Sequence, residues 1–184
     1  PLVIVAEGIE PETGKVFPAG INESDAKIRI ILDPIDGTRG LMYDKRAAWS
    51  LAGAAPNKGR QTRLSDIEVA VMTELPTSKM AYSDVLHAIK GQGAHAQREP
   101  LFQNSQFSIQ NLPLGPSRAT TLAHGFASIS NFFPGTKVLA SQLMEHLAHE
   151  LLGPANVNTA SLFDDQYIST GGQFYELIVG HDRF

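Results

Sequence analysis

The sequence predicts a layered α+β fold, or a closely related α/β sandwich. Up to about residue 126, short runs of β-branched and apolar residues alternate with Gly, Pro, Asn and Asp, which is typical of strands joined by turns. From residue 136 to residue 153, apolar residues recur every three to four positions, which is typical of an amphipathic helix. Strands followed by helices favour packed layers of the two kinds of element.

The predicted strands follow from these apolar runs. We expect strands at residues 2–6, at 27–32 with an end at Asp33, at 49–55, at 67–75, in two arms of 83–97, and at 119–126. The stretch NKGR at 57–60 predicts a turn, as does the glycine-bearing stretch Lys90–Gly93. Residues 8–26 show little periodicity and are expected to form a loop.

Two helices are predicted in the last third of the chain. In the first, at 136–153, an apolar stripe wide enough to lie on a sheet is formed by Leu139, Leu143, Leu147 and Leu151, flanked by Ala140, Met144, Ala148 and Leu152. The pair Gly153-Pro154 predicts the end of this helix. The second helix is expected from about Gly171 to Val179.

The composition excludes several classes of protein. With 184 residues, of which 42% are hydrophobic and 18% charged, the chain is long enough to bury a core. A formal net charge of -4 argues against a nucleic-acid polymer as partner. The absence of cysteine excludes disulfides and thiolate sites. No membrane span or signal peptide is recognised, and a cytoplasmic location is assumed only by default.

Both ends of the chain resemble cuts through a fold. An apolar strand begins directly after Pro1, and Phe184 follows closely on a helical pattern. We therefore interpret residues 1–184 as one incomplete domain, with a metal-motif part at 1–115 and part of a second half at 116–184. A processed or trimmed chain is the alternative.

The stretch LDPIDGTRG, at 32–40, carries the most chemistry. Asp33 and Asp36 follow a buried-looking strand, and carboxylates held by a turn are good ligands for hard divalent cations such as Mg²⁺. The carbonyl of Ile35 can face the same point, and the hydroxyl of Thr38 can orient a water. Gly37 and Thr38 are expected to begin a helix, whose free N–H groups favour a phosphate. Metal, water and anion would then lie within one turn, as phosphoester hydrolysis requires.

A capped β-turn is the simpler interpretation of such a stretch, because Asp, Pro, Gly and Thr all favour turns. The full string at the end of a strand nevertheless resembles the metal-binding signature of the inositol monophosphatase superfamily, which includes fructose-1,6-bisphosphatases and bisphosphate nucleotidases. The similarity extends over about 2–97, including the turn from Lys90 to Ala94, and over 167–180, where STGGQFYELIVG resembles the start of a family helix. The resemblance implies a layered αβαβα sandwich.

The resemblance also implies residue roles. Asp33, Asp36, the Ile35 carbonyl and Thr38 would bind metal, with Thr38 and Asp36 acting in catalysis. Gly37 and Thr38 would supply N–H groups to the substrate phosphate. Glu7 occupies the place of a further glutamate ligand, with Glu10 and Glu12 as alternatives. The family further implies two or more Mg²⁺ ions, lithium sensitivity and homodimers.

The sequence departs from the family pattern in three places. Arg39, Gly40 and Leu41 follow the threonine, where the family often has a small or basic residue, then Asn or Glu, then an aromatic residue. The late W-D-x-A-A-G motif is absent, since the single tryptophan is Trp49. An early acidic residue would precede residue 1. With these carboxylates missing, we expect weak metal binding and poor hydrolysis by the chain itself.

Several other clusters have plainer interpretations. His146 and His149 are expected on the solvated face of their helix, and KGQGAH is expected to be a hairpin turn rather than a dinucleotide fingerprint. Asp164 and Asp165 are interpreted as solvated loop carboxylates, with a polyol or ion contact as the alternative. Arg183 is interpreted as complementing a helix end, with a phosphate contact as the alternative.

The sequence therefore predicts a Mg²⁺-dependent phosphomonoesterase of the inositol monophosphatase type, acting on a small phosphorylated polyol, sugar or nucleotide. The alternative is a non-catalytic module that binds phosphate or metal.

Overall fold

The structure, a computed structural model, describes residues 1–10, 13–102, 108–156 and 159–184. The chain forms two compact units, Pro1–Pro113 and Leu114–Phe184, and each is described by itself. We interpret the whole chain as one domain, with parts at 1–115 and 116–184, and this stays a prediction. No helix of the described residues is long and apolar enough to cross a membrane.

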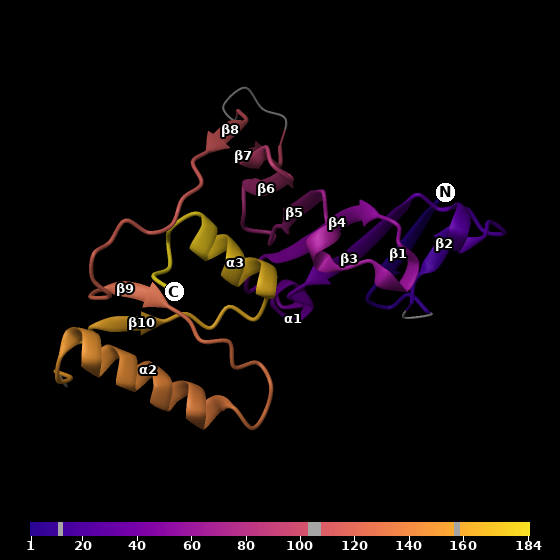
Figure 1. Ribbon diagram of the computed structural model, residues 1–184. Helices are drawn as coiled ribbons and strands as arrows, with labels where there is room; N and C mark the ends of the chain where they lie inside the picture. The colour runs from indigo at the N-terminus through magenta and orange to yellow at the C-terminus, as the bar shows by residue number, and fades with distance from the viewer. Residues whose placement is uncertain (11–12, 103–107, 157–158) are drawn as a thin grey trace. The chain divides into compact units, whose positions relative to one another are not determined.

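An eight-stranded mixed sheet forms the first unit (Figure 1). In spatial order the strands are β2 (Lys15–Phe17), β1 (Leu2–Ala6), β3 (Ile28–Asp36), β4 (Ala48–Pro56), β5 (Val69–Leu75), β6 (Tyr82–Ile89), β7 (Gly93–Pro100) and β8 (Gln110–Leu112). Only β1 and β3 pair in parallel; the other neighbours are antiparallel. A short helix, α1 (Thr38–Met42), follows β3 directly. The parallel pair therefore brings the ends of β1 and β3 to the same edge of the sheet.

The long strands of this sheet agree with the sequence prediction, and three details differ. The strand expected to end at Asp33 continues to Asp36. The region 8–26, expected to be loop, contains the strand β2 and a 3₁₀ turn at Glu23–Asp25. The strand β8 was not expected. Both missed strands have three residues, which is too short for an alternating pattern to be distinguished from a loop.

The most buried large side chain of the first unit is Trp49, which is 0% exposed. Val3, Ala48 and Leu86 are also buried in this unit. Trp49 lies on β4, where its backbone pairs with Asp36 on one side and with Glu74 on the other. The strand beside the aspartate motif is therefore anchored by a close-packed side chain.

The second unit contains two helices and a two-stranded parallel sheet (Figure 1). The sheet consists of β9 (Gly125–Ala127) and β10 (Leu162–Asp164), and a parallel bridge joins Phe126 to Asp182. The helices are α2 (Lys137–Leu152) and α3 (Thr170–Ile178), within one residue of the predicted bounds. The strand predicted at 119–126 is wrong for 119–124, because only its last two residues belong to β9.

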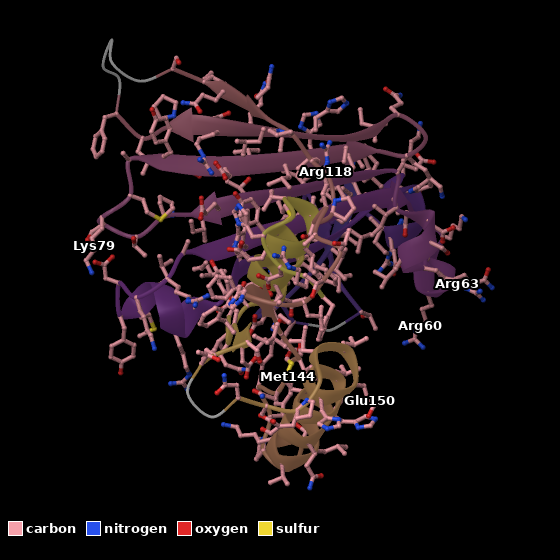
Figure 2. The ribbon with its side chains drawn as sticks, turned by 90° about the vertical axis from the view of Figure 1, so that its left-hand side faces the viewer. Arg60, Arg63, Lys79, Arg118, Met144 and Glu150 are labelled. Carbon is pink, nitrogen blue, oxygen red and sulfur yellow. The ribbon has the colours of Figure 1, made fainter. Side chains whose placement is uncertain are left out.

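The apolar stripe of α2 forms as predicted, but it is largely exposed. Leu139 is 68%, Leu143 47% and Leu151 61% exposed, and Ala140 is the single residue of the helix that is buried. Figure 2 shows two other side chains of this helix, Met144 and Glu150. Packing of the stripe on a sheet is therefore not found among the described residues.

Candidate metal centre

A bulge in β3 brings Asp33 and Asp36 to the same face of the sheet. Residues three apart in a regular strand point to opposite faces. Here Asp33 pairs with Leu51 and Asp36 with Trp49, so β3 advances by three residues while β4 advances by two. The extra residue is a β-bulge, which restores the two carboxylates to one side. This irregularity explains why a strand can run directly into a pair of acidic residues that work together.

The third carboxylate, Glu7, comes from the neighbouring strand. In the parallel pair, Ala6 is opposite Leu32, so Glu7 and Asp33 are the next residues along their chains, at the point where pairing between β1 and β3 ends. Glu10 is also exposed, but it does not contribute to the electrostatics of Asp33, whereas Glu7 does. Glu12, the other alternative, lies outside the described residues. Among the glutamates that the structure describes here, Glu7 is therefore the better partner for Asp33.

The turn after Asp33 is held by its own polar groups. The backbone N–H of Ile35 donates to Asp33 Oδ1 at 3.1 Å, and the hydroxyl of Thr38 donates to the Ile35 carbonyl at 2.8 Å. Gly37 caps α1 with φ 93°, a left-handed conformation that glycine adopts without steric cost. The Ile35 carbonyl has a second lone pair, and the Thr38 oxygen can still accept a hydrogen bond.

The pKa of Asp33 is affected by burial and by the two other carboxylates of the candidate site, those of Asp36 and Glu7. The pKa of Asp33 is raised above its ordinary value, first by burial, which disfavours the charged form, and then by the negative charges of Asp36 and Glu7. The hydrogen bond from the Ile35 N–H lowers this pKa and offsets part of the effect. A concentration of negative charge at one edge of a sheet is relieved by a bound cation.

The carboxylates are nevertheless not drawn together around one point. Within the described residues, no group of three or more His, Asp or Glu side chains lies close enough to hold a metal ion. Three like charges repel each other, and Glu7 is an exposed side chain that is free to change rotamer. The donor set consists of carboxylate, carbonyl and hydroxyl oxygens, which is the ligand chemistry of hard divalent cations. The residues present thus fit such a cation in chemistry, and closing of the ligand set would accompany binding.

Two interactions that the sequence did not reveal support the motif. Asp44, in a left-handed conformation with φ 51° two residues after α1, accepts hydrogen bonds from the N–H and the hydroxyl of Ser78, each at 2.7 Å. These bonds lower the pKa of Asp44, with a smaller contribution from Lys79, which is labelled in Figure 2. The segment after the motif is thereby tied to the loop between β5 and β6.

The second supporting interaction is a polar network inside the sheet. Arg98 donates from Nε and Nη2 to the two carboxylate oxygens of Asp84, both at 2.8 Å, and the Asp84 side chain is 2% exposed. The N–H of Asp84 donates to Glu74 Oε2 at 3.1 Å. Since Glu74 pairs with Trp49, and Trp49 with Asp36, this network fixes the strands behind the motif. No sequence signal for it exists, because its members lie 10 to 14 residues apart on separate strands.

The histidines and the glycine-bearing turn are found where their plainer interpretations put them, whereas the two aspartates are not both solvated loop residues: Asp164 ends the strand β10, and Asp165 is half-buried. His146 and His149 are exposed on α2. Residues around Lys90–Gly93 form the hairpin turn between β6 and β7. Asp164 accepts hydrogen bonds from Gln166 Nε2 at 2.8 Å, and the N–H of Asp165 donates to the Ala127 carbonyl. None of these arrangements is a metal site.

Sequence comparison identifies no relative: no protein-family model matches the chain, and no curated protein matches it. Solved structures do match it in fold. Fructose-1,6-bisphosphatase of Leishmania major in the T-state has 12% identity and a TM-score of 0.57 over 96% of this chain and 53% of that one. Extragenic suppressor protein suhB of Bartonella henselae has 16% identity and a TM-score of 0.57 over 98% and 54%.

A Ca-bound IMPase family protein of Staphylococcus aureus has 13% identity and a TM-score of 0.53, covering 97% of this chain and 50% of that chain. The chain thus spans about half the length of the solved structures that it matches. Another match is an IMPase/NADP phosphatase complexed with NADP and Ca²⁺. These likenesses establish a fold shared by all four, and the predicted resemblance in fold is confirmed.

Proposed function

We propose that this chain, which has the α+β fold of the inositol monophosphatase superfamily, carries the metal- and phosphate-binding motif of a metal-dependent phosphomonoesterase. The observation that supports the proposal most is the bulge between Asp33 and Asp36, which puts both carboxylates on one face beside the position of Glu7. The sheet could hold its strands together without this irregularity. The raised pKa of Asp33, which burial causes first and the charges of Asp36 and Glu7 increase further, supports the same interpretation.

In the proposed site, Asp33, Asp36, Glu7 and the Ile35 carbonyl hold Mg²⁺ or a similar cation. When bound, such a cation polarises phosphoryl oxygens and makes water a nucleophile at neutral pH. Thr38 donates its proton to the Ile35 carbonyl, so its oxygen is left to accept a hydrogen bond from the attacking water. The same hydroxyl is close enough to the metal ligands to serve as a further oxygen donor.

Backbone N–H groups of Gly37 and Thr38 are proposed to bind the substrate phosphate. The first N–H groups of a helix have no intrahelical acceptor. Because α1 has five residues, its macrodipole is small, and the proposal depends on the N–H groups themselves. Hydrolysis then forms a bond from the water oxygen to phosphorus and breaks the ester P–O bond. One water proton is released to solvent, and the leaving alkoxide takes up a proton to give the free alcohol.

The test is release of inorganic phosphate from an inositol phosphate, fructose bisphosphate and adenosine bisphosphate, at millimolar Mg²⁺ and with excess chelator. Because the chain lacks the further carboxylates of the family pattern, we expect its turnover to be weak, to require metal and to be lost in Asp36→Asn. Thr38→Val, which keeps the shape but removes the hydroxyl, should reduce turnover on the order of 10²-fold by releasing the water, whereas Thr38→Ser should retain most of it. Turnover that is unaffected by chelator, by Asp36→Asn and by Thr38→Val would overturn the proposal.

A second candidate function is a module that binds metal or phosphate without catalysis. It is favoured by one observation, namely that the described residues contain no preassembled cluster of three metal-binding side chains. A single ion held by Asp33, Asp36 and Glu7 is sufficient for binding, whereas two-metal hydrolysis needs further ligands. Metal binding that is lost in Asp36→Asn, together with no turnover on any substrate, would select this function. Lithium sensitivity, a homodimer and the substrate class belong to the enzyme proposal and are tested with it.

A further inference from the structure

A polar cavity lies within the second unit. Its volume is about 280 Å³, and it is formed by the segment that leads into β9, by the end of α2 and by the residue after Asp182. Its polar lining consists of Arg183, Ser117, Thr120 and Thr121, and the rest is Ala119, Leu122 and Leu151. No acidic side chain lines it. The cavity therefore combines one cation, three hydroxyl groups and a small apolar wall.

Arg183 is held in place by contacts that leave its charge uncompensated. Its N–H donates to the Phe126 carbonyl at 2.7 Å, and Nη1 donates to Ser117 Oγ at 2.6 Å. Nε is buried and has no hydrogen-bond partner among the residues that the structure describes. It packs on Gly125, where a Cβ atom would lie 2.4 Å from it. No carboxylate of the described chain forms an ion pair with this guanidinium, so a partly buried positive charge faces the cavity.

The hydroxyl groups around Arg183 are arranged as donors. Ser117 Oγ accepts from Arg183 Nη1 and, at 3.4 Å, from the N–H of Ala119, so its own hydrogen remains available. Thr121 Oγ1 accepts from the N–H of Ala123 at 3.2 Å, which leaves its hydrogen available as well. The hydroxyl of Thr120 has no protein partner in the described part of the chain. A ligand in this cavity thus encounters several donors and no charged acceptor, which is the environment of an anion.

We propose that the cavity binds a tetrahedral oxyanion, the phosphate or sulfate group of a small molecule. A planar carboxylate is best bound through two parallel N–H donors of an arginine, and one of the two such pairs of Arg183, the pair that includes Nε, is closed because Nε is packed on Gly125. Donors from one guanidinium and three hydroxyls on different residues surround a group in three dimensions, which suits a tetrahedral anion. Leu122 and Leu151 would contact the organic part of the ligand.

The test excludes metal, so that anion binding in this cavity is measured without a cation bound at the metal motif. The chain, labelled with ¹⁵N and kept in excess chelator, is titrated separately with inorganic phosphate, sulfate and acetate while the amide spectrum is recorded. Phosphate and sulfate should shift the amides of 117–122 and of Arg183 saturably, leaving those of Gly37 and Thr38 unchanged. The two anions distinguish a phosphate ligand from a sulfate ligand by affinity. Acetate that binds as tightly as both, or an absence of saturable shifts, would overturn the proposal.

Matched variants test the assignment to Arg183. Arg183→Gln should weaken phosphate binding by about tenfold or more, since a charge-assisted hydrogen bond is lost. Arg118→Gln removes the same charge from the exposed neighbour of Ser117, labelled in Figure 2, and should change the affinity by less than about twofold, as expected for a screened surface charge. Equal losses in both variants would show a general charge effect and refute the site.

Arg183 also packs against Gly125, so its replacement can disturb folding. Thr120→Val leaves the contacts of the guanidinium unchanged and removes one donor, whereas Ser117→Ala removes one donor together with the acceptor of Arg183 Nη1. Each should weaken phosphate binding about three- to tenfold, the usual range for a single hydrogen bond, while the rest of the amide spectrum stays unchanged. If neither variant alters phosphate binding, the hydroxyls are not donors to the ligand and the proposed site is wrong.

Discussion

Replacing Asp33 by asparagine should stabilise the metal-free chain and abolish its stabilisation by metal. Asp33→Asn removes a charge that burial, Asp36 and Glu7 all disfavour. Asparagine keeps the oxygen that accepts the hydrogen bond from the Ile35 N–H, so the turn survives. The variant therefore separates charge from structure at this position, which alanine would not do.

The magnitude follows from the strand pairing. Glu7 and Asp33 follow paired residues of parallel strands, and neighbouring strands are about 4.8 Å apart. Two carboxylates roughly 5–7 Å apart, at an effective dielectric constant of about 40–80, repel each other by about 0.6–1.7 kcal/mol before screening by salt. Allowing for partial exposure, we expect a gain of about 0.5–1 kcal/mol, which corresponds to about 1–4 °C in Tm for a chain of this size.

With metal bound, the wild-type chain should become more stable than Asp33→Asn. At a cation concentration ten times its Kd, the wild-type chain should gain about 1.4 kcal/mol, or about 3–6 °C, because only the folded state binds. Asp33→Asn should gain little. The assay is thermal unfolding with and without Mg²⁺ or Ca²⁺, and Asp25→Asn, which removes the same charge from an exposed position outside the motif, is the matched control. A lower Tm of metal-free Asp33→Asn, or an undiminished response to metal, would refute the reasoning.

Three further predictions concern the framework of the site. Trp49→Ala should destabilise the chain by about 3–5 kcal/mol in urea unfolding, because a fully buried indole leaves a cavity, and a loss below about 1 kcal/mol would contradict the packing described here. The lowered pKa of Asp44 means that its bonds to Ser78 stabilise the fold above the unfolded pKa, and that this contribution disappears as pH falls through the lower folded pKa. Asp44→Asn should therefore be less stable than wild type at pH 7, with a difference that vanishes in acid; a difference independent of pH would be inconsistent with this ionisation. Gly172→Ala should destabilise the second unit, since its Cβ would lie 2.4 Å from the Tyr167 ring, and an unchanged Tm would show that the ring yields.

Much of the first unit is predictable from sequence, because its long strands combine β-branched residues with clear turn signals. The bulge in β3 is not predictable in the same way. The apolar run at 27–32 predicted a strand that ends at Asp33, whereas the chain continues pairing with β4 after one extra residue. A bulge is specified by the register of the partner strand, and the sequence of β3 alone does not contain that register.

In the second unit, the sequence predicts less about packing and strand pairing. The period of α2 predicts the helix correctly, but periodicity indicates only which residues share a face, and most leucines of this stripe are exposed. At 119–126 the residues suggest a strand by composition, whereas Ser117 and Thr121 bind nearby backbone N–H groups with their hydroxyls. Local bonds of this kind compete with strand pairing, and their outcome depends on tertiary contacts.

The motif predicted which residues form the candidate site and their order along the chain. It did not predict the strand pairing that brings them together. Asp33, Asp36 and Thr38 stand in the motif itself, and Glu7 was selected because it follows the first apolar run. The parallel pairing that brings Glu7 to Asp33 joins segments more than 20 residues apart, so it follows from the topology of the sheet. Asp44 and the Asp84–Arg98 pair gave no signal, because single acidic residues in a strand or a turn are common.

The most direct test is a crystal structure of the chain soaked with Ca²⁺. The central claim is that Glu7, Asp33 and Asp36 bind one divalent cation. We predict an ion with carboxylate oxygens of Asp33 and Asp36 at about 2.3–2.6 Å, and with Glu7 bound directly or through one water. An ion elsewhere, or Asp33 and Asp36 pointing apart with Glu7 remote from both at saturating Ca²⁺, would contradict it.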